Sequence, residues 1–355
     1  MRLVIALLLL MTLANVLYAA PEKVILDSDM LTDFDDLGAL ACLHALADDG
    51  KCEILATISC TRGNASVGAM EVVNAYYGRP GILVGCAKER GVRGDGVTPD
   101  RYQDHAKYRD LIAAYSKWVR YPNSDDAPDA NLVYRRVLSA QPDRSVVICS
   151  VGFMTNLRRL LETKPDSISE LCGRDLVAKK VKRWVAMAFA YPRGREYNVM
   201  WDVGSARYVL ENWPTQVVFS DGTYGGDLFA GRAVLERGRT RSPIKDVFSN
   251  MPARDVFLKN PILWQQRNFG LKGRASWDET AVLAAVEGEN SYFNVHRGRF
   301  VIVDEKGANE WIHDEEHGPH LRLTERIHKA EVGRIIDELL CRPPKSMLNS
   351  GCNEL

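Results

Sequence analysis

The sequence predicts an α/β fold with a mostly parallel central sheet flanked by helices, in a Rossmann-like arrangement. Short runs rich in Val and Ile alternate along the chain with segments of helix length. These runs are nearly continuous in apolar residues, which indicates strands buried on both faces, as in a parallel sheet. Repeated alternation of such strands with helices is typical of βαβ units. A chain of 355 residues is long enough for one large domain of this kind.

The individual elements follow from these runs in chain order. The expected strands are Lys23–Asp27, Cys52–Ser59, Gly81–Gly85, Ser145–Ser150, Arg183–Ala188, Thr215–Ser220 and a late strand, Arg299–Asp304. Amphipathic segments predict helices at Leu37–Ala47, Val67–Tyr77, Leu132–Ala140, Asn156–Glu162, Ser205–Asn212 and Thr280–Val286, with a terminal helix at Thr324–Leu340. Two polar segments, Arg90–Tyr121 and Gly238–Gly273, interrupt the alternation, and such insertions often form lids or binding loops.

The first twenty residues predict a secretory signal peptide. Arg2 precedes a leucine-rich run from Leu3 to Leu13, and small residues follow at Ala19 and Ala20. The run is short for a membrane span, and no other segment is apolar for long enough, so stable membrane insertion is not expected. We therefore expect a secreted or periplasmic protein. Residues 1–20 would form the signal peptide, residues 21–340 one catalytic domain and residues 341–355 a C-terminal tail.

Charge and cysteine content limit the classes of partner and cofactor. The 46 basic residues balance the 46 acidic ones, which argues against binding to a nucleic acid polymer. The eight cysteines form no C-x-x-C pair, so a zinc ribbon is not expected. Three of them lie in or beside strand-like runs and should be buried, and two pairs could form disulfides in an oxidising compartment. The buried group is Cys60, Cys86 and Cys149, and the pairs are Cys341 with Cys352 and Cys42 with Cys52.

A dense carboxylate cluster directly follows the first predicted strand. Five carboxylates lie within the ten residues Asp27-Ser28-Asp29-Met30-Leu31-Thr32-Asp33-Phe34-Asp35-Asp36. Like charges at this density must be solvated, protonated or bound to a cation. A hard cation such as Ca²⁺ or Mg²⁺ is a natural partner for several carboxylate oxygens. The alternative is a solvated acidic turn in which Asp35 or Asp36 caps the following helix.

This cluster resembles the N-terminal signature of the inosine–uridine-type nucleoside hydrolases, Asp-x-Asp followed by Asp-Asp and an apolar helix, in its longer, Met-containing form. Further segments occur in the order found in that family, and the resemblance covers roughly Glu22 to Val286. Taken alone, each segment is better explained by a helix cap or a polar loop, and it is the ordered set that favours the resemblance. They are Gly63-Asn64, Ser150-Val151-Gly152-Phe153-Met154-Thr155-Asn156-Leu157, Glu196-Tyr197-Asn198 with Asp202, and Ser276-Trp277-Asp278-Glu279-Thr280-Ala281.

The resemblance implies a nucleoside hydrolase-type fold and a calcium-dependent enzyme. Such an enzyme cleaves the N-glycosidic bond of a ribonucleoside or related N-riboside, giving free base and ribose. The implied Ca²⁺ ligands are the side chains of Asp29, Asp36 and Asp278 and the backbone carbonyl of Val151, with Asp29 also acting as general base. The implied substrate contacts are Asp35, Asn64 and Asn198 at the ribose hydroxyls, Glu196 at the 5′-hydroxyl and Trp277 beside the base, while Asp27 orients the loop.

The sequence departs from the family pattern at two places. Many members have a histidine directly before the late aspartate, where this chain has Trp277, so protonation of the leaving base is unassigned. The segment from Met187 to Gly194 offers no Asn, so the 5′ side of the substrate site differs. His105, in the first insertion, is another candidate proton donor.

Other classes of function compete with this interpretation. A haloacid dehalogenase-type phosphatase also begins with a strand and Asp-x-Asp, but that class leaves Glu196, Asn198 and Asp278 unexplained. An exported nucleoside- or ribose-binding protein without turnover, and a structural calcium-binding module, are the non-enzymatic alternatives. The expected partner is a small-molecule nucleoside, and the sequence leaves a homo-oligomer open.

Overall fold

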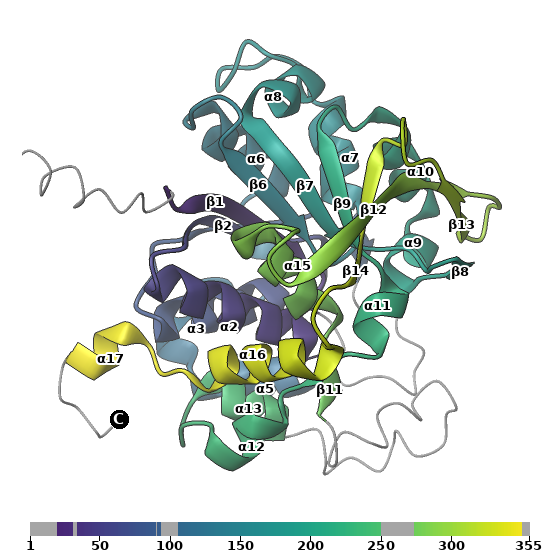
Figure 1. The fold of residues 1–355 in the computed structure, drawn as a ribbon. Helices are drawn as coiled ribbons and strands as arrows, with labels where there is room; N and C mark the ends of the chain where they lie inside the picture. Colours follow the sequence, from purple (N-terminus) through teal and green to yellow (C-terminus); the bar gives the residue numbers. More distant parts are fainter. Residues whose placement is uncertain (1–19, 31–33, 90, 94–105, 250–272, 350–355) are drawn as a thin grey trace, which may run out of the picture.

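The computed structural model describes residues 20–30, 34–89, 91–93, 106–249 and 273–349. A ten-stranded sheet runs through the molecule in the order β4-β2-β1-β6-β7-β9-β14-β12-β13-β8 (Figure 1). From β4 to β14 all neighbouring strands are parallel, whereas β12, β13 and β8 extend the sheet in antiparallel pairs. The predicted mostly parallel α/β sheet is therefore confirmed.

The parallel strands carry the Val- and Ile-rich runs. They are β1 (Glu22–Ser28), β2 (Cys52–Ser59), β4 (Leu83–Cys86), β6 (Val146–Ser150), β7 (Val181–Met187), β9 (Gln216–Ser220) and β14 (His320–Glu325). The antiparallel strands are β12 (Phe293–Ile302), β13 (Ala308–His313) and β8 (Arg193–Arg195). Two short ladders lie outside this sheet, β3 (Thr61–Arg62) with β5 (Val92–Arg93) and β10 (Phe229–Ala230) with β11 (Arg274–Ala275).

Helices cover both faces of the sheet and form a separate core with each (Figure 1). One layer contains α2 (Asp35–Asp48), α3 (Ser66–Tyr76), α5 (Ala106–Ala114), α12 (Arg232–Arg237), α13 (Pro243–Ser249), α15 (Trp277–Glu287) and α16 (Lys329–Cys341). The other contains α6 (Ala130–Ser139), α7 (Thr155–Glu162), α8 (Gly173–Lys180) and α10 (Val203–Asn212). Shorter helices are α9 (Tyr197–Trp201), α11 (Gly222–Gly226), α17 (Lys345–Asn349) and the 3₁₀ turns η2 (Ser116–Trp118) and η3 (Ser124–Asp126).

Two of these helices are buried on almost every side. In α2 all residues from Asp35 to Leu46 are buried, and in α15 all residues from Asp278 to Val286 are buried. A helix that is apolar around its whole circumference belongs in an interior. Accordingly α15 packs between α2 and strands β6, β7 and β9. This packing brings the acidic first turns of α2 and α15 into the interior.

The end of the chain corrects two predictions. The expected helix Thr324–Leu340 is wrong at its start, because His320–Glu325 is strand β14, inserted between β9 and β12. Helix α16 begins only at Lys329, where the His328 side chain accepts a hydrogen bond from the Ala330 amide. The expected strand Arg299–Asp304 is the second half of the longer β12. Antiparallel strands form by pairing between segments, which the apolar run of a single segment does not reveal.

The cysteine predictions have mixed outcomes. Cys60, Cys86 and Cys149 are buried, as expected. Cys42 and Cys52 are free thiols, so the suggested disulfide between them is wrong; the Cys52 thiol instead donates to the Leu43 carbonyl at 3.5 Å. Cys341 is also free. The predicted partner Cys352, residues 1–19 of the expected signal peptide and His105 lie outside the described residues.

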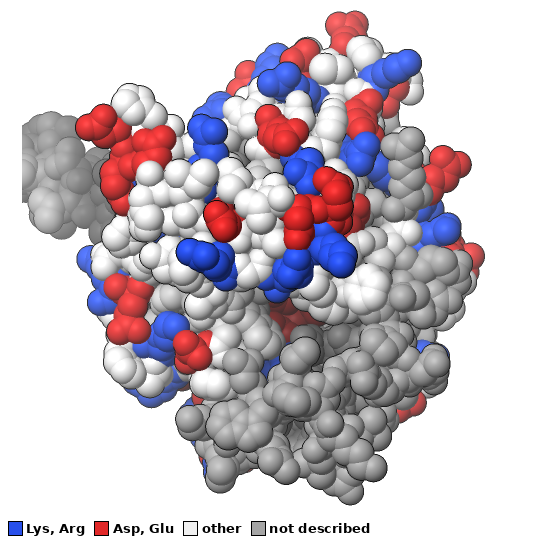
Figure 2. Space-filling view, turned by 90° about the vertical axis from the view of Figure 1, so that its right-hand side faces the viewer, with Lys and Arg blue, Asp and Glu red and all other residues white. Residues whose placement is uncertain are grey.

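The surface reflects the balanced composition. On the face in Figure 2, Lys and Arg side chains lie interspersed with Asp and Glu over the described part of the chain. Charged side chains also form ion pairs with each other, such as Arg195 with Asp304 and Lys182 with Glu22. Within the described ranges, no helix combines the length and apolar character that a transmembrane span needs.

Candidate active site

Two segments that carry predicted site residues lie where the chain order of the sheet reverses. Strands β1 and β6 are neighbours, and from them the chain proceeds outward to β2 and β4 on one side and to β7 and β9 on the other. Ligands of open α/β sheets bind at the carboxyl ends of the strands at such a switch point. Strand β1 ends at Ser28, so Asp29 directly follows it, and Val151 directly follows β6.

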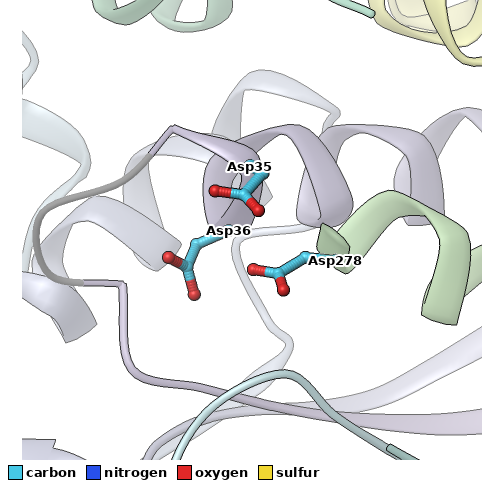
Figure 3. Close-up of side chains that lie close together, drawn as sticks. All are labelled: Asp35, Asp36 and Asp278. Carbon is cyan, nitrogen blue, oxygen red and sulfur yellow. The ribbon is translucent and has the colours of Figure 1, made fainter. Parts of the chain in front are cut away.

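Three buried carboxylates converge at this point. Asp35 and Asp36 lie in the first turn of α2, and Asp278 lies in the first turn of α15. One oxygen from each lies within 4.8 Å of the others. Figure 3 shows the three side chains reaching into the same space from the two helix ends. Helix N-termini favour negative charge, which partly offsets the repulsion among these groups.

The remaining repulsion indicates that the cluster needs a cation or protons. Burial, followed by the charges of Asp35 and Asp36, raises the pKa of Asp278 well above its ordinary value. Without a counter-charge, such groups are driven toward the neutral form. The three-carboxylate group includes neither Cys nor His, so its donors are the oxygens that hard cations such as Ca²⁺ and Mg²⁺ prefer. The residues present therefore fit a hard divalent cation.

Asp29 lies beside this group rather than within it. The resemblance assigned Asp29 to the metal and Asp35 to ribose, but the three mutually close carboxylates are Asp35, Asp36 and Asp278. Asp29 is buried and its charge contributes to the raised pKa of Asp278. Asp35 and Asp36 are adjacent in one helical turn, and this places both against the first turn of α15.

The loops after β1 and β6 touch each other, which brings Asp29 and Val151 together. A Cβ atom on Gly152 would lie 2.5 Å from the Asp29 amide nitrogen, so this contact requires glycine. The Val151 amide donates to the Asp27 carbonyl at 2.8 Å.

Asp36 is held from the same loop. The Ser28 hydroxyl donates to Asp36 Oδ1 at 2.6 Å, and the Met30 amide donates to that oxygen at 3.0 Å. One carboxylate oxygen of Asp36 is therefore fixed by the protein, which orients the other.

Asp27 forms a buried hydrogen-bonded layer beneath the site. The Tyr134 hydroxyl donates to its Oδ2 at 2.7 Å, and Asn156 Nδ2 donates to the same oxygen at 3.1 Å. Burial raises the pKa of Asp27 to about 7. Asn156 also donates to the Ser59 carbonyl at 3.0 Å, so it joins the ends of β1 and β2 rather than merely beginning a helix. The sequence signalled the position of Asn156 but not this role, and it did not single out Tyr134.

Two expected ribose contacts make structural hydrogen bonds. Asn64 Oδ1 accepts from the Ser66 amide at 3.1 Å, and Asn64 Nδ2 donates to Thr61 Oγ1 at 2.8 Å, so Asn64 stabilises the start of α3. Glu196 caps α9 and accepts from the amides of Asn198 at 2.8 Å and Val199 at 3.2 Å. Burial raises the pKa of Glu196 to about 7.

Asn198, another expected ribose contact, lies against the carboxyl ends of two central strands. Its Nδ2 donates to the Val151 carbonyl at 3.1 Å and to the Met187 carbonyl at 3.2 Å. The buried Asn198 side chain thus connects α9 with the carboxyl ends of β6 and β7.

Trp277 is half-buried against the helical core. Its indole Nε1 donates to the Gly222 carbonyl at 2.9 Å, and the Arg274 guanidinium lies 4.8 Å from the ring centroid. A Cβ on Gly225 would lie 2.7 Å from the Trp277 Cα, so α11 packs directly on this residue. The side chain is therefore anchored by its N–H and offers only its ring to a ligand.

Glu279 is a buried carboxylate that sequence reasoning missed. It is 1% exposed, and its Oε2 has no hydrogen-bond partner among the described residues. A Cβ on Gly38 would lie 2.2 Å from Glu279 Oε1. The glycine in α2 therefore leaves space for the Glu279 side chain, which comes from α15. Burial and the charge of Asp35 raise the pKa of Glu279 well above its ordinary value. The only sequence signal was its position directly after Asp278.

The chain is similar to known proteins of one family along most of its length. The model of the family described as inosine-uridine preferring nucleoside hydrolase matches residues 24–338. No curated protein matches the chain.

Among solved structures, a purine-preferring ribonucleoside hydrolase from Gardnerella vaginalis is 15% identical, with a TM-score of 0.63 over 91% of this chain and 98% of that one. The inosine-uridine preferring nucleoside hydrolase of Bacillus anthracis is 15% identical, with a TM-score of 0.58 over 90% and 99%. The type III effector protein XopQ, complexed with adenosine diphosphate ribose, is 17% identical, with a TM-score of 0.65 over 91% and 94%. At these identities the structural matches establish the shared fold.

Proposed function

The chain belongs to the inosine-uridine preferring nucleoside hydrolase family, and on this basis we propose that it is a calcium-dependent enzyme acting on ribonucleosides or a related N-riboside. Membership of the family makes it an enzyme that hydrolyses N-glycosyl bonds. The observation that carries the finer proposal is the convergence of Asp35, Asp36 and Asp278 within 4.8 Å at the sheet's switch point. The products would be free base and ribose.

The residues proposed to hold Ca²⁺ are Asp29, Asp36 and Asp278, with the Val151 carbonyl. Asp35 is close enough to Asp36 and Asp278 to take part, or to accept a hydrogen bond from a ribose hydroxyl beside them. When bound, the cation would supply positive charge that positions and acidifies a water molecule. The contact between Gly152 and Asp29 supports this set, because it brings the carbonyl ligand and the side-chain ligands to one place.

Asp29 is proposed as the general base. Cleavage of an N-riboside proceeds through a ribosyl cation-like state, with water attacking the anomeric carbon as the C–N bond breaks. Asp29 lies beside the three-carboxylate group and would accept the proton that this water loses. The neighbouring carboxylates also provide negative charge that stabilises positive charge developing on the sugar.

The ribose is proposed to lie between Asp35, Asn64, Asn198 and Glu196. Both amide hydrogens of Asn198 point at backbone carbonyls, so its Oδ1 is the atom left to accept from a ribose hydroxyl. Glu196 lies two residues away and is held by backbone amides, which would fix it for the 5′-hydroxyl.

The leaving base is proposed to stack near Trp277 and to take its proton from another group. The Trp277 N–H is bonded to Gly222, and an indole does not act as a general acid. Stacking on the ring is the contribution this side chain can make. The leaving group therefore departs without help from the position where many family members have a histidine.

We also propose that the protein is exported, as a secreted or periplasmic enzyme. Arg2, the apolar run from Leu3 to Leu13 and the small residues at Ala19 and Ala20 support this proposal. Expression with the natural N-terminus and analysis of cell fractions tests it directly. Retention of the full-length chain in the cytoplasm would contradict export.

The main test is a panel of purine, pyrimidine and other N-ribosides incubated with the purified protein, with and without a chelator. Release of free base and ribose should depend on added Ca²⁺. The matched control is the Asp29→Asn variant, purified identically, which excludes a contaminating hydrolase. Release of phosphate from phosphate esters, with no base released from any riboside, would favour the phosphatase alternative. Binding of ribosides without release of base would favour the non-catalytic one.

A further inference from the structure

The Asn198 amide bridges two strand ends beside the proposed metal centre. Its Nδ2 lies 3.1 Å from the Val151 carbonyl oxygen and 3.2 Å from the Met187 carbonyl oxygen. Both neighbours are acceptors only, so the group that faces them must be the amide NH₂. With one hydrogen directed at each carbonyl, the plane of the amide is fixed.

We propose that Asn198 is a positioning residue of the metal centre, holding the Val151 carbonyl oxygen in the direction that a cation requires. The inference rests on the proposed function, in which that carbonyl is a Ca²⁺ ligand. A backbone carbonyl oxygen has two lone pairs, so a hydrogen bond from Asn198 leaves the second one available. Groups that hydrogen-bond to metal ligands orient them, and their loss typically weakens metal binding.

The backbone on both sides of the Val151 carbonyl is held by other contacts. The Val151 amide donates to the Asp27 carbonyl at 2.8 Å. The next residue, Gly152, packs against the Asp29 amide so closely that no Cβ would fit. These contacts place Val151 near the carboxylates, and the hydrogen bond from Asn198 sets the direction of its carbonyl.

Side-chain hydrogen bonds stabilise both ends of the helix that carries Asn198, which helps to hold its amide in place. Glu196 accepts from the backbone amides of Asn198 and Val199 at the start of α9. At its end, Asp202 accepts from the Thr155 hydroxyl and from the Ser205 amide. Thr155 begins α7, a few residues after Val151, so the end of α9 is hydrogen-bonded to the segment that follows β6.

The test measures Ca²⁺ affinity in the absence of substrate, so that a ribose contact cannot contribute. The full-length protein is stripped with a chelator and titrated with Ca²⁺ by calorimetry. Asn198→Ala should weaken the Kd by about 10- to 100-fold. The matched control is Val199→Ala, a buried neighbour in the same turn whose side chain has no hydrogen-bonding group. It should lower thermal stability while leaving the Kd within about threefold of wild type.

Several outcomes overturn the inference. An unchanged Kd in Asn198→Ala does so, and so does an equal loss in both variants, which would show that Asn198 acts only through the stability of α9. If Asn198→Ala fails to fold by circular dichroism, Asn198→Ser is titrated instead. It keeps one donor, so a smaller loss of affinity is expected, and an unchanged Kd again overturns the inference.

The inference and the proposed function fail differently. A wild-type protein that neither binds Ca²⁺ nor releases base from any riboside refutes both. A wild-type protein that binds Ca²⁺ and hydrolyses ribosides, combined with an Asn198→Ala variant of unchanged Kd, refutes the positioning role alone.

Discussion

Asp36 and Asp278 come from two helices far apart in sequence, yet their carboxylate oxygens lie within 4.8 Å of each other at the carboxyl edge of the sheet. Each occupies the first turn of an almost completely buried helix, and α2 packs directly against α15. Two buried negative charges held this close are unfavourable without a counter-charge. This pairing accounts for the expected sensitivity of the protein to metal removal.

Asp29→Asn and Asp278→Asn are each expected to lower turnover by at least about 1,000-fold, the first through loss of the base and the second through weaker metal binding. The measurement is kcat/KM on the best riboside from the panel. Glu316→Gln, an exposed substitution, is the control and should behave as wild type. Near-wild-type activity in either aspartate variant would remove that residue from the site.

Removal of the cation should destabilise the folded protein. Ca²⁺ present at 100 times its Kd would add about 2.7 kcal/mol to the free energy of unfolding. We expect the Tm to fall with chelator and to recover with Ca²⁺, and Asp278→Asn to abolish this response. Elemental analysis of the purified protein should find calcium, and stoichiometric zinc without calcium would refute the assignment.

Substitutions of Trp277 distinguish a role in stacking on the base from a structural role. Trp277→Phe should keep most of the activity but lose about 1 kcal/mol of stability, because the hydrogen bond to Gly222 is removed. Trp277→Ala should raise KM and lower kcat/KM. The lower kcat/KM should correspond to a loss of about 1 kcal/mol or somewhat more in transition-state stabilisation.

Trp277→His tests whether a missing acid limits the rate. It should increase kcat for ribosides with poor leaving bases, with a new ionisation near neutrality in the pH profile. Unchanged rates in both the Ala and His variants, with the fold intact, would show that Trp277 is structural.

The raised pKa of Glu196 predicts how the free energy of unfolding depends on pH. Burial raises its pKa from 4.5 to about 7 in the folded protein. An acid whose pKa is higher in the folded state binds a proton on folding, so its contribution to the free energy of unfolding decreases as pH rises from about 4.5 through 7.

Glu196→Gln lacks this ionisation, so the wild type should lose about 3 kcal/mol relative to the variant between pH 4.5 and 8. Urea unfolding in chelator across this range measures the difference. A difference that stays constant with pH would contradict the buried, raised-pKa carboxyl.

Gly38→Ala tests the packing of Glu279 against α2. Alanine in a helix interior normally stabilises by up to about 1 kcal/mol. Here the new Cβ would meet Glu279 Oε1 at 2.2 Å, so we expect a net loss of roughly 1–2 kcal/mol in the free energy of unfolding. In a Glu279→Ala background the close contact is absent, so the Gly38→Ala change should no longer lower the free energy of unfolding. A stabilised Gly38→Ala single variant would contradict the contact.

The sequence by itself determined the parallel part of the fold and the general location of the site. The apolar runs at β1, β2, β6, β7 and β9 were recognisable because a strand buried on both faces must be continuously apolar. The carboxyl ends of these strands share one edge, so polar residues that follow them were expected to lie together. Asp36, Asp278 and Val151 could be selected because their local motifs match the family order.

Only the tertiary structure decided which of these residues touch. It brought Asp35 into the group with Asp36 and Asp278, placed Glu279 over Gly38 and directed the Asn198 amide at Val151. It also decided that His320–Glu325 is a strand, through pairing with β9 and β12. These outcomes depend on the packing of segments distant in sequence, whereas periodicity and motif spacing report only what each segment does along its own length.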